Sequence, residues 1–135
     1  MGPLLFLIFI NDIATNVSSS IRLVADDCLV YRETRTREEC KLLQDDLDEL
    51  VAWSKTWGML FNVSKCNIIS ITNATKKKQC YSYQMNDQPV KTINSSPYLG
   101  VTINNELQWN QHIDNISSAA NRMLGFLQRT LYKFP

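Results

Sequence analysis

IRLVADDCLVY, residues 21–31, decides the fold: two short apolar runs lie on either side of the acidic pair Asp26-Asp27. Runs of this length, separated by a polar break, are typical of two strands joined by a tight turn. We therefore predict a β-hairpin that carries both carboxylates at its turn.

Helical patterns lie on both sides of this hairpin. Pro3 suits a first helical position, and residues 4–14 continue as a helix that is apolar nearly all round. After the hairpin, Thr36 and Glu39 have the spacing of a capping box, so a helix is expected from about residue 37 to 57. A helix that is apolar all round must be buried, and nothing precedes this one to cover it. We therefore expect poor solubility.

Shorter patterns occupy the C-terminal half. They predict strands at residues 67–72, 81–85, 90–93 and 98–103. A last helix is expected from near Trp109 to about Tyr132, because apolar residues recur there at three- and four-residue steps. The order helix, hairpin, helix, strands, helix predicts an α+β fold.

Length and composition are those of one ordinary globular domain. The 135 residues are enough for one hydrophobic core, and 44% hydrophobic with 20% charged residues give no sign of disorder. The formal net charge is +1, whereas a free-standing nucleic-acid binder usually carries a clear basic excess. Composition by itself therefore gives no support to a nucleic-acid-binding role.

The N-terminal apolar run, residues 4–10, is too short to cross a bilayer. No basic residue precedes it and Asn11-Asp12 follows at once, so it does not match a secretory signal. We expect an intracellular protein, cytoplasmic or nuclear, with no membrane partner.

The cysteines and the single histidine, His112, do not form a zinc-binding pattern, because no two cysteines have CxxC spacing. A secreted disulfide framework would need a secretory signal, so we expect free thiols in a reducing compartment. The cysteines are Cys28, Cys40, Cys66 and Cys80.

Asp26-Asp27 is the feature that points to chemistry. Two adjacent carboxylates between apolar strands repel each other and lose hydration, and a divalent cation would offset both costs. Mg²⁺ prefers carboxylate oxygens, and two such ions can stabilise phosphoryl transfer. The alternative is a turn dipeptide that faces water. A two-ion site would also need at least one more carboxylate from another strand.

Five motifs, in the same order, resemble those of reverse transcriptases from non-LTR (LINE-type) retrotransposons, over nearly the whole chain. They are GPLLFLIFINDI at residues 2–13, RLVADDCLVY at 22–31, LQDDL…W…WGM…FN…KC at 43–66, YLGV at 98–101, and LQW…HI…GFLQR at 107–129. The resemblance implies a partial polymerase palm at residues 1–104, built of the helix, the Asp-Asp hairpin, the second helix and antiparallel strands. The start of the thumb would follow at residues 105–135.

The resemblance also implies roles for single residues near the reacting phosphates. Asp26 would be the catalytic, metal-ligating acid, and Asp27 its less critical neighbour, with Mg²⁺ or Mn²⁺ bound weakly in this chain alone. Lys65 would be the motif lysine near the phosphates of the incoming nucleotide. The alternative for Lys65 is a turn lysine in water.

Other residues would meet the nucleic acid, which in the family is an RNA template with a DNA primer. Tyr98, Leu99 and Gly100 would approach the primer, although plain strand packing is equally compatible with this strand. Arg122, Arg129 and Lys133 give the last helix a basic end, because no acidic residue follows Asp114. This end would meet the nucleic-acid backbone, and a solvated helix face is the alternative.

Several other residues of the motifs are expected to be structural. Trp53 and Trp57 are four residues apart and should pack the second helix rather than stack bases. His112 is also expected to be structural.

The sequence departs from the family pattern at two points. Val24 stands where the family has an aromatic residue, two positions before the acidic pair. The family's other metal-binding Asp lies on a strand upstream of GPLLF, with the fingers and a glycine-rich loop, and Asp12 at a helix end cannot replace it. We therefore expect no polymerase activity from this chain alone, and we expect a partner in the missing N-terminal fingers and palm part. Two alternatives stay open: a module that binds RNA–DNA hybrids without catalysis, and an unrelated soluble interaction domain.

Overall fold

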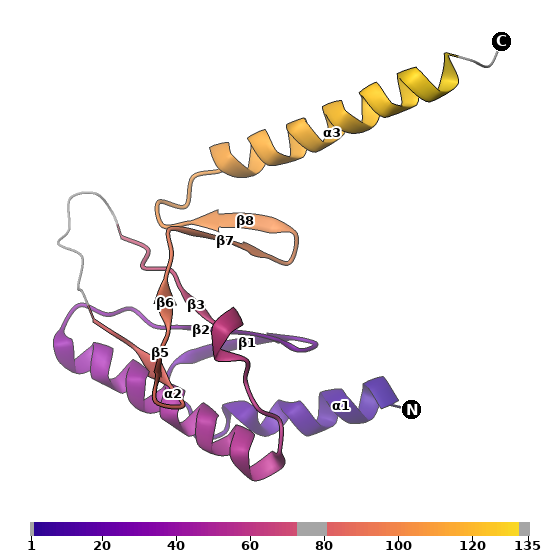
Figure 1. The fold of residues 1–135 in the computed structure, drawn as a ribbon. Coiled ribbons are helices and arrows are strands. Elements are labelled where there is room, and N and C mark those ends of the chain that lie inside the picture. The colour runs from indigo at the N-terminus through magenta and orange to yellow at the C-terminus, as the bar shows by residue number, and fades with distance from the viewer. Residues whose placement is uncertain (1, 73–80, 133–135) are drawn as a thin grey trace. The chain divides into compact units, whose positions relative to one another are not determined.

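The computed structural model, which describes residues 2–72 and 81–132, confirms the predicted hairpin (Figure 1). β1 (Ser20–Val24) pairs antiparallel with β2 (Asp27–Tyr31), from Ser20 opposite Tyr31 to Val24 opposite Asp27. Ala25 and Asp26 form the two-residue turn between the strands. The predicted turn at Asp26-Asp27 is therefore wrong by one residue: Asp26 lies in the turn, and Asp27 is the first residue of β2.

The predicted helix after the hairpin is confirmed as α2 (Arg37–Trp57). The Thr36 side chain accepts a hydrogen bond from the Glu39 backbone N–H, and the Glu39 side chain accepts one from the Thr36 N–H. Gly58 ends the helix in the left-handed conformation, with φ 71°. These two local signals explain why both ends of α2 could be placed from the sequence.

The N-terminal helix is confirmed with a tighter last turn than expected. α1 (Gly2–Ile10) continues into a 3₁₀ helix, η1 (Asn11–Ala14), as is frequent where α-helices end. Ile10 and Ile13 are buried against Leu50 of α2 and form the main hydrophobic core. The side chains of the hairpin that pack on this core are Ile21, Leu23 and Val30.

A second small hairpin covers another part of α2. β4 (Gln84–Met85) and β5 (Gln88–Pro89) are joined by a turn in which Asn86 and Asp87 both have positive φ. The Gln44 side chain donates to the Gln84 carbonyl and accepts from the Gln84 N–H, both at 2.9 Å. Gln44 therefore substitutes for a neighbouring strand and fixes this hairpin to the helix.

The remaining strands are shorter than predicted. The strand expected at residues 67–72 is limited to β3 (Asn67–Ile68), and the one at 90–93 to β6 (Lys91–Thr92), with which β3 pairs. The strand expected at 81–85 is formed by its last two residues, those of β4. A strand of two residues is too short to show an alternation of apolar and polar residues, so the sequence could not give its length.

The single strand predicted at residues 98–103 is also wrong. Here the chain forms a hairpin of β7 (Ser95–Tyr98) and β8 (Val101–Asn104). Leu99 and Gly100 form the turn with φ 49° and 81°, the pattern of a type I′ turn. Gly100 is therefore explained first by the turn, which needs a residue that accepts positive φ.

The last helix is confirmed as α3 (Asn110–Leu131). Its first turns contact β8: the Thr102 N–H donates to His112 Nδ1 at 3.3 Å, and Asn115 Nδ2 donates to Thr102 Oγ1 at 3.3 Å. The structural role predicted for His112 is thereby confirmed. From there on, every residue of α3 is exposed or half-exposed.

The chain divides into two compact units. The first unit is Met1–Cys66 with Lys78–Lys91, and the second is Asn67–Lys77 with Thr92–Pro135. Cys80 and Lys133 lie outside the described residues. Among the helices within residues 2–72 and 81–132, none combines the length and apolar composition needed to cross a bilayer. The predicted palm–thumb boundary at residue 104 stays a prediction.

Candidate functional site

The candidate site is the tip of the β1–β2 hairpin, where Asp26 and Asp27 are both exposed. Ala25, the first turn residue, has φ 53°, a conformation that L-residues other than glycine and asparagine adopt rarely. Positive φ at the first position alone is the pattern of a type II′ turn. The strained backbone is therefore that of Ala25, directly before Asp26, and strain of this kind is found frequently at functional sites.

The two faces of the hairpin have different surroundings. Side chains alternate along a strand, so Ile21 and Leu23 face the core while Arg22 and Val24 face outward. Asp27 is paired with Val24 and thus shares the outward face. The Arg22 guanidinium lies 5.8 Å from the centre of the Tyr31 ring on that face. Asp27 therefore belongs to the surface that a substrate could reach.

The base of the hairpin is fixed to α2 by a buried carboxylate, Asp46, whose exposed fraction is 4%. Asp46 accepts hydrogen bonds from the backbone N–H groups of Ser18 and Ser19, both at 2.8 Å, and from both serine hydroxyls. From the other strand end, Arg32 Nη1 donates to Ser18 Oγ at 2.8 Å and lies 3.5 Å from Asp46 Oδ2. The start of β1 and the end of β2 are thus both held by the side chain of Asp46.

The ionised form of Asp46 is the one that these contacts stabilise. Desolvation raises the pKa of this carboxyl, but the hydrogen bonds from Ser19 and Ser18 outweigh it, so the net pKa lies below its ordinary value. Sequence reasoning missed this residue. The signal was present, because Asp46 lies three residues after Leu43 and four before Leu50, on the helical stripe that faces the core.

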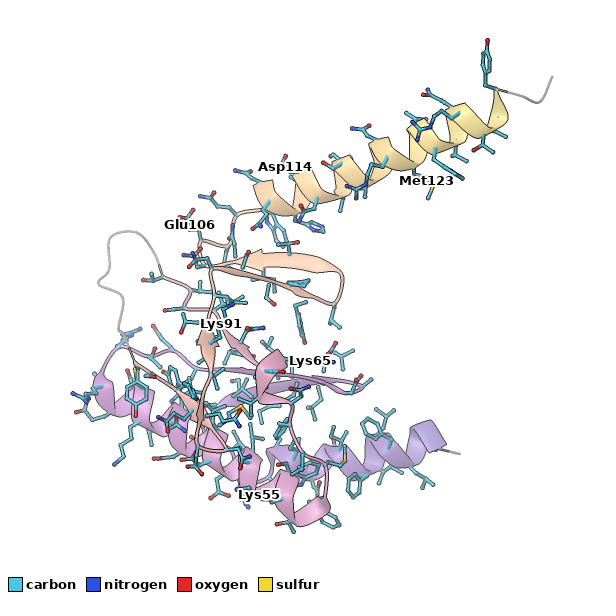
Figure 2. The ribbon with its side chains drawn as sticks, in the orientation of Figure 1. Lys55, Lys65, Lys91, Glu106, Asp114 and Met123 are labelled. Atoms are coloured by element: carbon cyan, nitrogen blue, oxygen red, sulfur yellow. The ribbon has the colours of Figure 1, made fainter. Side chains whose placement is uncertain are left out.

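Lys65 lies at the end of a short 3₁₀ helix, η2 (Val63–Lys65), and is exposed (Figure 2). Burial raises the pKa of the Cys28 thiol, and the Cys66 thiol raises it further, so these two sulfur atoms lie within electrostatic range. Cys28 follows Asp27, and Cys66 follows Lys65. The role of Lys65 at the phosphates of a nucleotide stays a prediction.

The other predicted site residues belong to the second unit. Tyr98 is half-buried at the end of β7, while Leu99 and Gly100 form the exposed turn. Arg122 and Arg129 are exposed on α3. Their roles at the primer and at the nucleic-acid backbone stay predictions.

The donor set at the hairpin tip fits a hard divalent cation in kind but not in number. Carboxylate oxygens are the ligands that Mg²⁺ and Mn²⁺ prefer. Within residues 2–72 and 81–132, however, no group of three or more His, Cys, Asp or Glu side chains could hold a metal ion. Asp26 and Asp27 thus supply part of a metal site, and further ligands would have to come from elsewhere.

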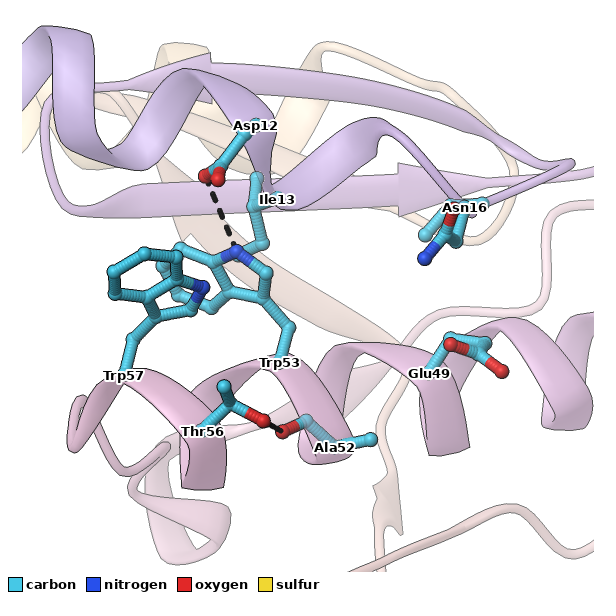
Figure 3. Close-up of a pocket in the computed structure, with 9 residues that line it drawn as sticks. Asp12, Ile13, Asn16, Glu49, Ala52, Trp53, Thr56 and Trp57 are labelled. Carbon is cyan, nitrogen blue, oxygen red and sulfur yellow. Dashed lines mark hydrogen bonds between the residues drawn. The ribbon is translucent and has the colours of Figure 1, made fainter.

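A pocket of about 250 Å³ lies between η1 and α2, apart from the predicted site residues (Figure 3). Trp53 Nε1 donates to Asp12 Oδ1 at 3.1 Å, and both Trp53 and Trp57 lie against Phe9, with ring centres 5.9 and 5.1 Å apart. The packing role predicted for the two tryptophans is confirmed. Asp12 is engaged at the helix end, as expected.

Comparison with known proteins supports the motif analysis. The profile of the family described as reverse transcriptase (RNA-dependent DNA polymerase) matches residues 1–103. No solved structure matches the chain.

Two similar proteins come from Drosophila melanogaster. The RNA-directed DNA polymerase from mobile element jockey is 27% identical over 128 residues, which cover 88% of this chain and 14% of that protein. The probable RNA-directed DNA polymerase from transposon X-element is 26% identical over 122 residues, 86% of this chain and 13% of that protein. The chain thus spans about one seventh of the length of these relatives. Because the family profile covers well over half of it, the chain belongs to the reverse transcriptase (RNA-dependent DNA polymerase) family, and it corresponds to a segment of a non-LTR retrotransposon polymerase.

Proposed function

We propose that this chain contributes the carboxylate hairpin of an RNA-directed DNA polymerase that uses Mg²⁺ or Mn²⁺. Reverse transcriptases as a family use divalent metals and bind template and primer strands. The observation that carries the proposal is the position of Asp26 and Asp27, exposed at the tip of a hairpin whose base is fixed by Asp46. Ligand groups on a rigid element hold their geometry without further reorganisation.

The proposal assigns different tasks to the residues of the first unit. Asp26 supplies a metal ligand, and Asp27 supports it from the outward face of β2. Asp46, Ser18 and Ser19 hold the base of the hairpin, so that its tip keeps one position. Lys65, exposed at the end of η2, is suited to meet the phosphates of a nucleotide.

The chain alone is expected to lack polymerase activity, because it carries part of the ligand set. Two-metal catalysis requires both ions in fixed geometry, and two adjacent carboxylates at the tip of one hairpin do not provide it. The remaining carboxylate would come from polymerase sequence upstream of this segment. The RNA template and the DNA primer would be partners of that larger protein.

Primer extension on an RNA template tests the proposal with two proteins. One is this chain, and the other extends it upstream with its own coding sequence. We expect incorporation from the longer protein alone, and a loss of roughly 1,000-fold or more with Asp26→Asn. Asp45→Asn, which changes an exposed carboxylate of α2, serves as the matched control and should leave the rate unchanged. Full activity of the Asp26→Asn protein would refute the role of this carboxylate.

A further inference from the structure

The start of α3 is joined to the β7–β8 hairpin by a histidine that accepts a hydrogen bond. The Thr102 backbone N–H donates to His112 Nδ1 at 3.3 Å, and Asn115 Nδ2 donates to Thr102 Oγ1 at 3.3 Å. We call these two hydrogen bonds the α3–β8 contact. All three residues belong to the second unit, so the contact lies within one compact part of the chain.

The Thr102 N–H points away from its own hairpin. Two-residue hairpins close on a hydrogen-bonded pair, here Tyr98 and Val101, and bonded and non-bonded pairs then alternate. The next pair, Pro97 and Thr102, is therefore of the non-bonded kind, and proline, which lacks an N–H, suits it. His112 thus satisfies a donor at the free edge of β8.

The α3–β8 contact determines which nitrogen of the imidazole carries a proton. A backbone N–H can only donate, so His112 Nδ1 must present a lone pair, and the proton of the neutral ring lies on Nε2. A second proton would turn Nδ1 into a donor that faces another donor. Protonation of His112 therefore removes its hydrogen bond with Thr102.

The surroundings of His112 provide no direct partner for an imidazolium ion. His112 is half-buried, and its ring lies 6.4 Å from that of Trp109, centre to centre. β8 has no titratable side chain, and the titratable groups of the adjoining segments are Tyr98 of β7, Glu106 before α3 and Asp114 within α3. In the described part of the second unit, none of these groups forms a hydrogen bond or ion pair with His112. The contact thus favours the neutral ring.

We propose that His112 is a positioning residue: its neutral imidazole holds the start of α3 on β8, and its protonation releases the helix. α3 packs chiefly on β8, so loss of the contact allows the helix to change its direction relative to the hairpin. The turn of that hairpin carries Leu99 and Gly100, and α3 carries Arg122 and Arg129. That the contact thereby sets the primer segment against the basic end of α3 rests on the proposed function, whereas the contact itself does not.

The position of the proton can be measured directly, because His112 is the single histidine of the chain. Nitrogen–proton correlation NMR spectra of the full chain at about pH 7.5, where neutral imidazole is common, should show a proton on Nε2 and none on Nδ1. A proton on Nδ1 under this condition would overturn the proposal. The measurement uses the wild type without nucleic acid, so its outcome is independent of polymerase activity.

Amide hydrogen exchange tests the release of the helix. Between about pH 7.5 and about pH 5, the range in which histidine changes its charge, the protection factor of the Thr102 N–H should fall roughly 10-fold, the usual effect of one hydrogen bond. The Ile103 N–H serves as the internal control, because the alternation of pairs places it in a bond with β7, and its protection should stay unchanged. Thr102 protection that does not respond to pH would overturn the proposal.

Two substitutions separate the acceptor of His112 from its charge. His112→Asn places an amide oxygen at the same number of bonds from the backbone as Nδ1, and this oxygen accepts a hydrogen bond without titrating. In this variant Thr102 should stay protected at both pH values, whereas His112→Leu, which lacks an acceptor, should leave Thr102 poorly protected at both. A pH effect that persists in His112→Asn would assign the release to another group and overturn the proposal. If a variant does not fold, the tautomer of the wild type still decides.

Discussion

α2 and α3 are nearly equal in length, with 21 and 22 residues, and both carry an apolar stripe, yet their environments differ. Leu50 of α2 is 2% exposed, whereas Leu127 of α3 is 43% exposed. α2 is covered by α1, η1 and two hairpins of the first unit, while α3 packs chiefly on β8 through its first turns. An amphipathic pattern thus predicts a helix and its apolar face, but it does not predict what covers that face.

The two helices also use charge differently. α2 carries Asp46 on its buried side, where four donor groups of Ser18 and Ser19 compensate the carboxylate. α3 keeps its charged residues, Asp114, Arg122 and Arg129, away from its apolar stripe. A charged residue on the apolar face of a helix is therefore compatible with the fold where hydrogen-bond donors of the same chain contact it. The hydrogen bonds from Ser18 and Ser19 to Asp46 also connect α2 to the hairpin of the candidate site.

The largest expected effect is a loss of stability when a core leucine of α2 is shortened, compared with an exposed leucine of α3. Leu50→Ala should lower the free energy of unfolding of the first unit by about 3 kcal/mol, because it leaves a cavity beside Ile10 and Ile13. Leu127→Ala should change the stability of the second unit by less than about 0.5 kcal/mol, because Leu127 is exposed and does not belong to the hydrophobic core. Guanidinium denaturation followed by far-ultraviolet circular dichroism measures both free energies of unfolding. Equal decreases in the two variants would contradict the different packing of α2 and α3.

A smaller effect is expected from the buried carboxylate. Asp46→Asn should lower the free energy of unfolding by about 2 kcal/mol, because an amide offers one acceptor oxygen in place of two. Asp45→Asn, at the adjacent exposed position, should stay within about 0.5 kcal/mol of the wild type. Urea denaturation of the two variants gives the difference. An unchanged free energy of unfolding in Asp46→Asn would show that the serine contacts do not hold the hairpin.

The pH dependence sharpens this test. Hydrogen bonds hold the pKa of Asp46 below its ordinary value of 3.8, so the carboxylate stabilises the fold above that pH. The contribution is lost as the pH falls through the lowered pKa. The stability difference between wild type and Asp46→Asn should therefore be constant near neutrality and shrink below about pH 4. A difference that grows on acidification would contradict the assigned sign.

Local signals made the first unit largely predictable from sequence. Thr36, Glu39 and Gly58 determine the ends of α2 through groups that lie within one helical turn. The alternation around Asp26-Asp27 likewise depends on neighbouring residues. The turn at Leu99-Gly100 was missed because leucine seldom adopts positive φ, so Leu-Gly inside an apolar run is typical of a strand.

The sequence predicts the acidic pair of the candidate site, but it does not predict that Asp46 holds the base of the hairpin. Asp26 and Asp27 follow from the hairpin pattern and the motif, whereas the buried role of Asp46 depends on contacts 27 and 28 residues away in sequence. Roles that depend on nucleic acid, such as those of Lys65 and Arg122, involve partners outside the chain. Sequence periodicity carries information on local conformation, and it carries little on such long-range compensation.

The smallest expected effect concerns the start of α2. Thr36→Ala should cost about 1 kcal/mol, because the Glu39 N–H loses its side-chain acceptor, while Thr36→Ser keeps that acceptor and should cost only a few tenths of a kcal/mol. At α3, Trp109 makes no such cap, and the helix start depends instead on the contacts of His112 and Asn115 with Thr102. Amide hydrogen exchange in the first turn of each helix measures the difference: Thr36→Ala should speed exchange in α2 alone. Equal acceleration in Thr36→Ser would mean that the methyl group, and not the hydroxyl, stabilises this end.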